Sequence, residues 1–176
     1  MLKRIDADSV LQICSSQVIT DLKSAVKELV ENSLDAGSTS LELRFFGHGL
    51  HGFEVTDNGK GIEEVSFDIL CKRGTTSKIE KYEDIYSIKS LGFRGEALSS
   101  LCSMGRVTVK TRKHDDETGF QLEYDKAGSL VSKEKISKNP GTTVTVRNMF
   151  GDLPVRLGEF RKTHKAQYSK CIALMQ

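Results

Sequence analysis

A helix predicted over about residues 18–34 carries the densest group of polar side chains that could do chemistry. Glu28, Asn32 and Asp35 stand at positions i, i+4 and i+7, a spacing that puts a carboxylate, an amide and a second carboxylate on one helix face. Apolar residues fill the other face, so the helix could bury one side and present the other to a ligand. The same pattern also fits an ordinary solvated helix face, and that alternative stays open.

A second polar group, Asp-Asn-Gly-Lys-Gly at residues 57–61, directly follows a predicted strand. Asp57 could accept a hydrogen bond from an exocyclic amine such as that of adenine. Gly59 and Gly61 would let the backbone approach a flat ligand closely. Asp-Asn-Gly is also a common turn sequence, so a plain turn is the alternative.

Glycines lead into another predicted helix, which begins near Glu96 in the string Gly92-Phe93-Arg94-Gly95-Glu96-Ala97-Leu98. Such a helix start offers free backbone N–H groups and a positive dipole end to an anion. No Gly-Lys-Ser/Thr sequence follows, so the string is not a Walker-type phosphate loop. A fourth group, Gly141-Thr142-Thr143-Val144, opens a predicted strand, where threonine is also simply a good strand residue.

The elements that would position these groups come in blocks rather than in strict alternation. Apolar periodicity predicts helices over about residues 18–34, 63–71 (short), from 96 onward, and 158–175. Alternation predicts strands at 41–45, 52–56, 107–112, 119–124 and 142–147. Residues 73–95 have no regular pattern, and so long a loop in a compact domain is usually functional, for example as a lid. We therefore expect an α+β fold with a mainly antiparallel sheet.

Bulk properties narrow the class of protein. A chain of 176 residues suffices for one domain, with 38% hydrophobic and 28% charged residues as in soluble globular proteins. The net charge of +2 is too small to imply nucleic-acid binding by itself. The sequence has no apolar run that could span a membrane and no signal peptide. Four scattered cysteines indicate reduced intracellular thiols, and His48 and His51 lack partners for a metal site.

Together and in this order, the four groups resemble the nucleotide site shared by gyrase, Hsp90, histidine kinases and MutL, the GHKL ATPases. The string at 92–98 with Thr76-Ser77-Lys78 ahead of it, residues 27–37, and Leu153-Pro154-Val155-Arg156 resemble MutL homologues of mismatch repair in particular. Residues 12–19 resemble those of the PMS type. The resemblance covers nearly the whole chain. It implies that residues 1–176 form a single amino-terminal ATPase domain, a two-layer sandwich of a mainly antiparallel mixed sheet with helices on one face, with transducer and C-terminal domains outside this chain.

The resemblance also implies a role for each matching residue, with ATP and Mg²⁺ as cofactors. Glu28 would be the general base for the attacking water. Asn32 would bind Mg²⁺ through its amide oxygen, and Asp57 would hold the adenine amine. The remaining nucleotide contacts would be Asp35, Ala36, Gly59, Gly61, Thr76, Ser77, Lys78, Gly92, Phe93, Arg94, Gly95, Glu96, Ala97, Leu98 and, on the adenine side, Thr143.

Partners follow from the same resemblance. ATP would order the lid at residues 73–95 and drive dimerisation, in PMS-type proteins with a second, different MutL homologue. Further expectations are contact with MutS homologues, weak non-specific binding of double-stranded DNA, a nuclear location and no membrane. The terminal helix offers basic residues for DNA, although an ordinary solvated surface fits them too: Arg161, Lys162, Lys165 and Lys170 against Glu159.

Two departures affect the expected activity. In MutL-like and gyrase-like proteins a lysine from a following domain touches the γ-phosphate, so we expect this chain alone to bind ATP and hydrolyse it slowly. Gly74-Thr75 stands where many relatives carry bulkier residues, which would loosen the lid.

Rival functions within the same site remain. A histidine kinase normally lacks a base at the position of Glu28, and gyrase and Hsp90 would not be expected to carry the string at 92–98 followed by Gly-Thr-Thr-Val. A non-catalytic, ATP-gated clamp has no need of that base. The sequence does not indicate whether an endonuclease domain belongs to the full protein.

Overall fold

The fold is that of a computed structural model, which describes residues 6–75 and 95–175. Its helices are α1 (Ala7–Val18), α2 (Leu22–Asp35), the 3-10 turn η1 (Glu64–Ser66), α3 (Ala97–Met104) and α4 (Pro154–Leu174). Its strands are β1 (Leu41–Phe46), β2 (Gly52–Asp57), β3 (Arg106–Arg112), β4 (Gly119–Tyr124), β5 (Leu130–Ile136) and β6 (Gly141–Arg147).

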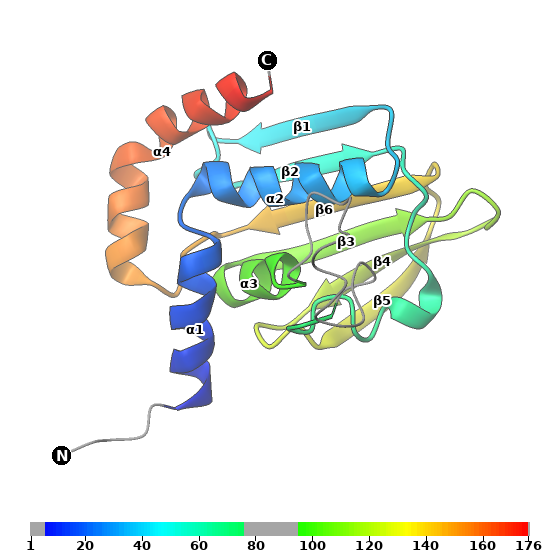
Figure 1. The fold of residues 1–176 in the computed structure, drawn as a ribbon, viewed down its shortest axis with the longest axis horizontal. Coiled ribbons are helices and arrows are strands. Elements are labelled where there is room, and N and C mark those ends of the chain that lie inside the picture. Colours follow the sequence, from blue (N-terminus) through cyan, green and yellow to red (C-terminus); the bar gives the residue numbers. More distant parts are fainter. Residues whose placement is uncertain (1–5, 76–94, 176) are drawn as a thin grey trace, which may run out of the picture.

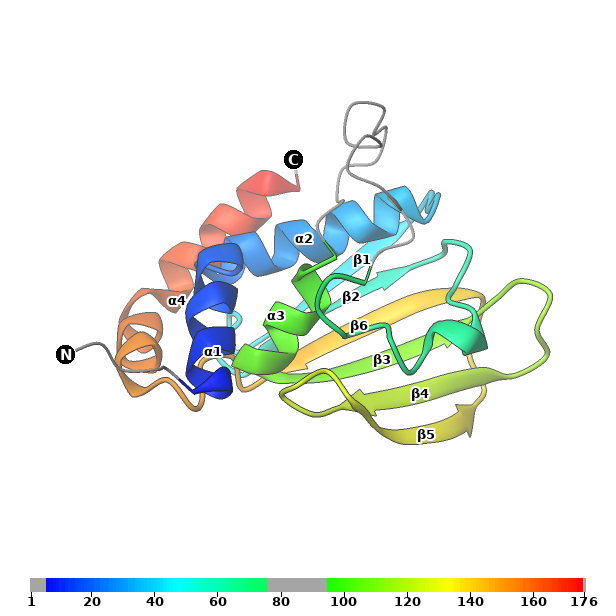
Figure 2. The ribbon, with the colours of Figure 1, turned by 60° about the horizontal axis from the view of Figure 1, so that its bottom comes forward.

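The strands form one six-stranded sheet in the order β1-β2-β6-β3-β4-β5. Neighbouring strands are antiparallel at every described pairing, so the sheet has no parallel component among them. Helices α1, α2 and α3 lie on one face of this sheet (Figures 1 and 2). The predicted α+β sandwich with helices on one face is therefore confirmed. In the described part of the chain, none of the helices has the length and apolar character needed to cross a bilayer.

The core lies between the sheet and α2. Leu22, Val26 and Leu29 are buried at helical spacing on α2, and β2, β3, β4 and β6 contribute buried residues to the same layer. Val55, Val109 and Val146 are examples from the three central strands. The intervening strand residues point to the opposite, helix-free face of the sheet.

Local signals explain where α2 begins and ends. Asp21 accepts a hydrogen bond from the Ser24 amide, and the Ser24 hydroxyl in turn receives the Asp21 amide, a reciprocal cap that starts the helix at Leu22 rather than at the predicted residue 18. At the other end Gly37 has a φ of +73°, the left-handed conformation that terminates a helix. The predicted helix at 63–71 is wrong: only η1 and turns form there.

Helix α4 begins with Pro154 in its first turn and is fastened to the rest of the fold by Arg156. The Arg156 guanidinium donates to the carbonyls of Ile19 (2.9 Å) and Thr20 (2.8 Å) and to the Ser16 hydroxyl (3.1 Å). It also stacks over the Phe150 ring at 4.1 Å. One side chain thus joins α4 to the turn between α1 and α2.

Arg156→Lys is expected to lower the free energy of unfolding by about 2 kcal/mol, because an ammonium cannot reproduce the guanidinium fork and its ring stacking. The measurement is the urea midpoint of both proteins. Arg161→Lys, at an exposed position of the same helix, is the matched control and should shift stability by less than about 0.5 kcal/mol. Equal effects of the two substitutions would contradict this role of Arg156.

Candidate functional site

Asp57 ends β2 on the helix-facing side of the sheet and is only 7% exposed. Its Oδ1 accepts hydrogen bonds from the amides of Gly59 (2.8 Å) and Thr142 (3.1 Å). Its Oδ2 accepts from the Ser33 hydroxyl of α2 at 2.9 Å. These bonds fix the orientation of the carboxylate, and Oδ2 still has room for a second donor. Asp57 is thus prepared to receive an N–H donor from a ligand.

The sequence predicted no role for Ser33 or for Thr142, although Thr142 belongs to the Gly141-Thr142-Thr143-Val144 group. The Ser33 hydroxyl has one proton and lies near two acceptors, Asp57 Oδ2 and the Leu29 carbonyl at 3.1 Å. The carboxylate is the stronger acceptor. Ser33 therefore ties α2 directly to the end of β2.

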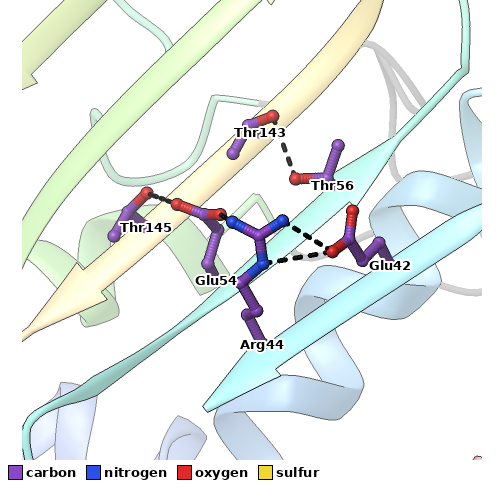
Figure 3. A network of polar contacts seen from close by, with 6 residues as sticks. All are labelled: Glu42, Arg44, Glu54, Thr56, Thr143 and Thr145. Carbon is purple, nitrogen blue, oxygen red and sulfur yellow. Dashed lines mark hydrogen bonds and ion pairs between the residues drawn. The ribbon is translucent and has the colours of Figure 1, made fainter. Parts of the chain in front are cut away.

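Thr143, predicted on the adenine side, does not join this cluster. Its hydroxyl shares a 3.1 Å hydrogen bond with that of Thr56 on the face away from the helices (Figure 3). The physical reason is strand alternation: Thr142 lies two residues before Val144, which packs against the core, so Thr142 faces the helices and Thr143 faces the other way. The Thr142 hydroxyl bonds to that of Thr111 at 3.1 Å.

The turn after Asp57 is wedged between α2 and the end of β3. The Lys60 amide donates to the Ala36 carbonyl at 3.1 Å. A Cβ on Gly59 would lie 3.0 Å from the Ala36 Cβ, and a Cβ on Gly61 would lie 2.4 Å from the Arg112 carbonyl oxygen. Gly61 is thus needed for backbone packing, whereas the sequence suggested only room for a ligand.

Gly61→Ala is expected to lower the free energy of unfolding by about 3 kcal/mol or more, because both a clash with fixed backbone and a φ of +74° oppose the new methyl group. Gly37→Ala is the matched control: its φ is +73° but nothing lies within 4 Å of the new Cβ. We expect that variant to lose about 1 kcal/mol. Thermal or urea unfolding of both proteins measures the difference, and equal losses would show that packing at Gly61 is unimportant.

Helix α2 brings Glu28, Asn32 and Asp35 to the same region, all half-buried on the helix that Ser33 fastens to Asp57. Each of the three already interacts with other groups of the protein. Asn32 supplies one hard oxygen, and the part of the chain that the structure describes has no cluster of His, Cys, Asp or Glu able to hold a metal alone. A magnesium ion at Asn32 would take its other ligands from phosphates and water.

The start of α3 fits the predicted anion site. Glu96 is its N-cap residue and its side chain makes no capping bond, so the amides that open the helix are not satisfied that way. Gly95 has a φ of +60° and its carbonyl receives the Gly74 amide at 3.1 Å. The Arg73 guanidinium pairs with the Glu96 carboxylate at 3.0 Å. These contacts join the two described ends of the predicted lid.

Several predicted site residues cannot be placed in this way. Thr76, Ser77, Lys78, Gly92, Phe93 and Arg94 lie outside the described residues. The basic residues of α4, in contrast, are described and exposed: Arg161, Lys162, Lys165 and Lys170.

The chain is similar to known proteins in its sequence. Residues 19–148 match the family described as histidine kinase-, DNA gyrase B-, and HSP90-like ATPase. The chain is 45% identical to DNA mismatch repair protein PMS1 of Arabidopsis thaliana over 99% of its own length and 19% of that protein. It is 44% identical to mismatch repair endonuclease PMS2 of Homo sapiens over 99% of its length and 20% of that protein. It therefore spans about a fifth of these relatives.

The fold is also similar to solved structures of DNA repair proteins. An N-terminal domain of a DNA repair protein superposes with a TM-score of 0.81 at 44% identity, covering 94% of this chain and 47% of the other. The Aquifex aeolicus MutL ATPase domain complexed with ADP superposes with a TM-score of 0.66 at 29% identity, covering 90% of this chain and 54% of the other.

Proposed function

Because the chain belongs to the histidine kinase-, DNA gyrase B-, and HSP90-like ATPase family and is a MutL homologue of the PMS type, we propose that it binds Mg-ATP and hydrolyses it slowly in the service of DNA mismatch repair. The oriented Asp57 carboxylate is the observation that carries this proposal. A carboxylate fixed by Gly59, Thr142 and Ser33 on the helix side of the sheet suits an exocyclic amine.

The other residues have roles that their positions permit. Asn32 offers an amide oxygen to Mg²⁺, which would offset the charge of the phosphates. The amides of Gly95, Glu96, Ala97 and Leu98 would donate hydrogen bonds to phosphate oxygens at the start of α3. Glu28, one turn before Asn32 on α2, accepts the proton of the attacking water.

Residues 73–95, together with the start of α3, act in this proposal as a lid that ATP orders. Ordering of the lid would let two such domains associate, and the partner would be a second MutL homologue. As a single ATPase domain, the chain would bind ATP and order its lid without a transducer domain. Its hydrolysis of ATP would be slow, because in this proposal the transducer domain supplies the lysine that touches the γ-phosphate.

Sedimentation velocity of the chain with and without a non-hydrolysable ATP analogue tests this dimerisation, alone and mixed with the equivalent domain of a second MutL homologue. We expect a twofold rise in mass with the analogue in at least one of these mixtures. Asp57→Asn is the control and should remain monomeric. Constant mass in every mixture would contradict ATP-driven association.

In this proposal the full protein also contacts MutS homologues and double-stranded DNA. It does so in the nucleus. The exposed basic residues of α4 would contact DNA phosphates without reading sequence. Such binding should fall steeply as salt rises from 50 to 200 mM. Salt-insensitive binding in a filter assay would exclude phosphate contacts.

A further inference from the structure

The face of the sheet opposite the helices carries a polar groove that the proposed nucleotide site does not use. Register places Thr56 opposite Thr143, Thr143 opposite Lys110, and Lys110 opposite Gln121, so these side chains form one row across the central strands. The groove along this row has a volume of about 440 Å³. That volume is in the range of small-ligand sites, roughly 300–1,000 Å³.

In one half of the groove the charged side chains are paired with one another. The Arg44 guanidinium pairs with Glu42 at 2.8 Å and lies 3.8 Å from Glu54. Glu54 also accepts the Thr145 hydroxyl at 2.8 Å. Figure 3 shows this network across β1, β2 and β6. With two carboxylates and one guanidinium, this half does not favour an anion.

The other half holds positive charges that make no ion pair with a described carboxylate. Lys110 and Lys138 line the groove, and Arg112 is two positions beyond Lys110 on β3, so it shares that face. Among residues 6–75 and 95–175 no carboxylate forms an ion pair with any of the three. The buried Arg112 Nε also has no hydrogen-bond partner within the described chain.

The electrostatics of Lys138 agree with an unsatisfied basic cluster. Its side chain is half-buried, and loss of solvation lowers its pKa from the ordinary lysine value. Lys110 and Arg112 lower that pKa further, while the carboxylates of Asp57 and Glu54 offset part of the shift. A bound anion would relieve this repulsion.

We propose that Lys110, Arg112 and Lys138, with the neighbouring Gln121 amide and Thr143 hydroxyl, bind a compact anion of the phosphate class on the open face of the sheet. Ammonium, guanidinium, amide and hydroxyl groups can all donate to phosphate oxygens. A compact anion fits better than an extended polyanion, because a strand of phosphates crossing the face would meet the carboxylates of Glu42 and Glu54. The site is separate from Asp57, whose partners Ser33 and Thr142 lie on the helix side.

Titration of the ¹⁵N-labelled chain with inorganic pyrophosphate, in the presence of saturating Mg-ADP, locates the site by amide shifts. We expect shifts at residues 108–112, 119–122 and 137–143. Shifts confined to residues 95–98 would overturn the proposal, since they would mean that pyrophosphate binds only at the start of α3.

The pyrophosphate affinity of variants that lose one positive charge is a second test. Lys110→Gln and Lys138→Gln should each weaken pyrophosphate binding about tenfold, the effect of one charge-assisted hydrogen bond. Lys138→Arg should retain binding, and the exposed Lys162→Gln on α4 should leave it unchanged. An equal loss in Lys162→Gln would mean diffuse attraction and would overturn the proposal. A competition experiment with a short DNA duplex gives a further outcome. If the duplex displaces pyrophosphate from this face at a lower concentration than pyrophosphate itself needs for binding, the proposal is overturned, because the ligand would then be a nucleic-acid backbone.

Discussion

Asp57→Asn is expected to lower the affinity of the chain for Mg-ATP by at least about a hundredfold. The substitution exchanges an acceptor oxygen for an NH₂ donor, and either orientation of the new amide is wrong. In one orientation the new NH₂ group faces the ligand amine, which is also a donor. In the other orientation the NH₂ group faces the amides of Gly59 and Thr142. Loss of a charge-assisted bond with an unsatisfied buried group costs about 3 kcal/mol. Isothermal titration with Mg-ATP measures the change.

Asp125→Asn is the matched control for this prediction. Asp125 Oδ1 also accepts two backbone amides, those of Ala127 at 2.9 Å and Ser129 at 2.8 Å, but in an exposed turn between β4 and β5. Its substitution should leave ATP affinity unchanged. If the folded Asp57→Asn protein binds Mg-ATP with an affinity within threefold of that of the original protein, the assignment of Asp57 to the adenine amine is wrong.

Glu28→Ala is expected to lower the rate of phosphate release by at least about a hundredfold while ATP affinity changes little. General-base catalysis contributes roughly 10²–10⁴ to a rate, and a methyl group cannot accept the proton of water. Because the isolated chain should turn over slowly, the measurement uses a longer form of the protein that includes the following domain. The isolated chain serves as a second sample and should be slower than the longer form.

Glu31→Ala is the control on the same helix. The Glu31 carboxylate pairs with Lys27 at 2.6 Å and has no proposed role in hydrolysis, so its loss should change the rate less than about twofold. If Glu28→Ala hydrolyses ATP as fast as the original protein, the domain is a non-catalytic, ATP-gated clamp or uses another base.

The elements with clear apolar patterns could be predicted from the sequence. Strands β1, β2, β3, β4 and β6 were predicted within one residue at each end, because apolar and polar residues alternate along them. Helix α1 was missed, since exposed Val10 and Ile13 leave it without a clean apolar stripe. Strand β5 was missed because it is an edge strand, whose charged run Lys133-Glu134-Lys135 hides its pairing with β4.

Of the candidate site, only the residues that form a local sequence pattern could be predicted. Asp57, Gly59 and Gly61 form a local sequence pattern, but Ser33 contacts Asp57 only because the fold brings α2 onto β2. Such a tertiary contact has no local signal. The position of Thr142 did have one: counting back in steps of two from buried Val146 puts Thr142, and not Thr143, on the helix side of β6.

The most direct test is a crystal structure of the chain with Mg²⁺ and a non-hydrolysable ATP analogue. We predict an adenine amine within hydrogen-bonding distance of Asp57 Oδ2, a magnesium ion on the Asn32 oxygen, and phosphates on the amides of residues 95–98. A nucleotide bound with its adenine away from Asp57, or one that reaches Asp57 but leaves Asn32 and the start of α3 untouched, would contradict the single shared site on which the account rests.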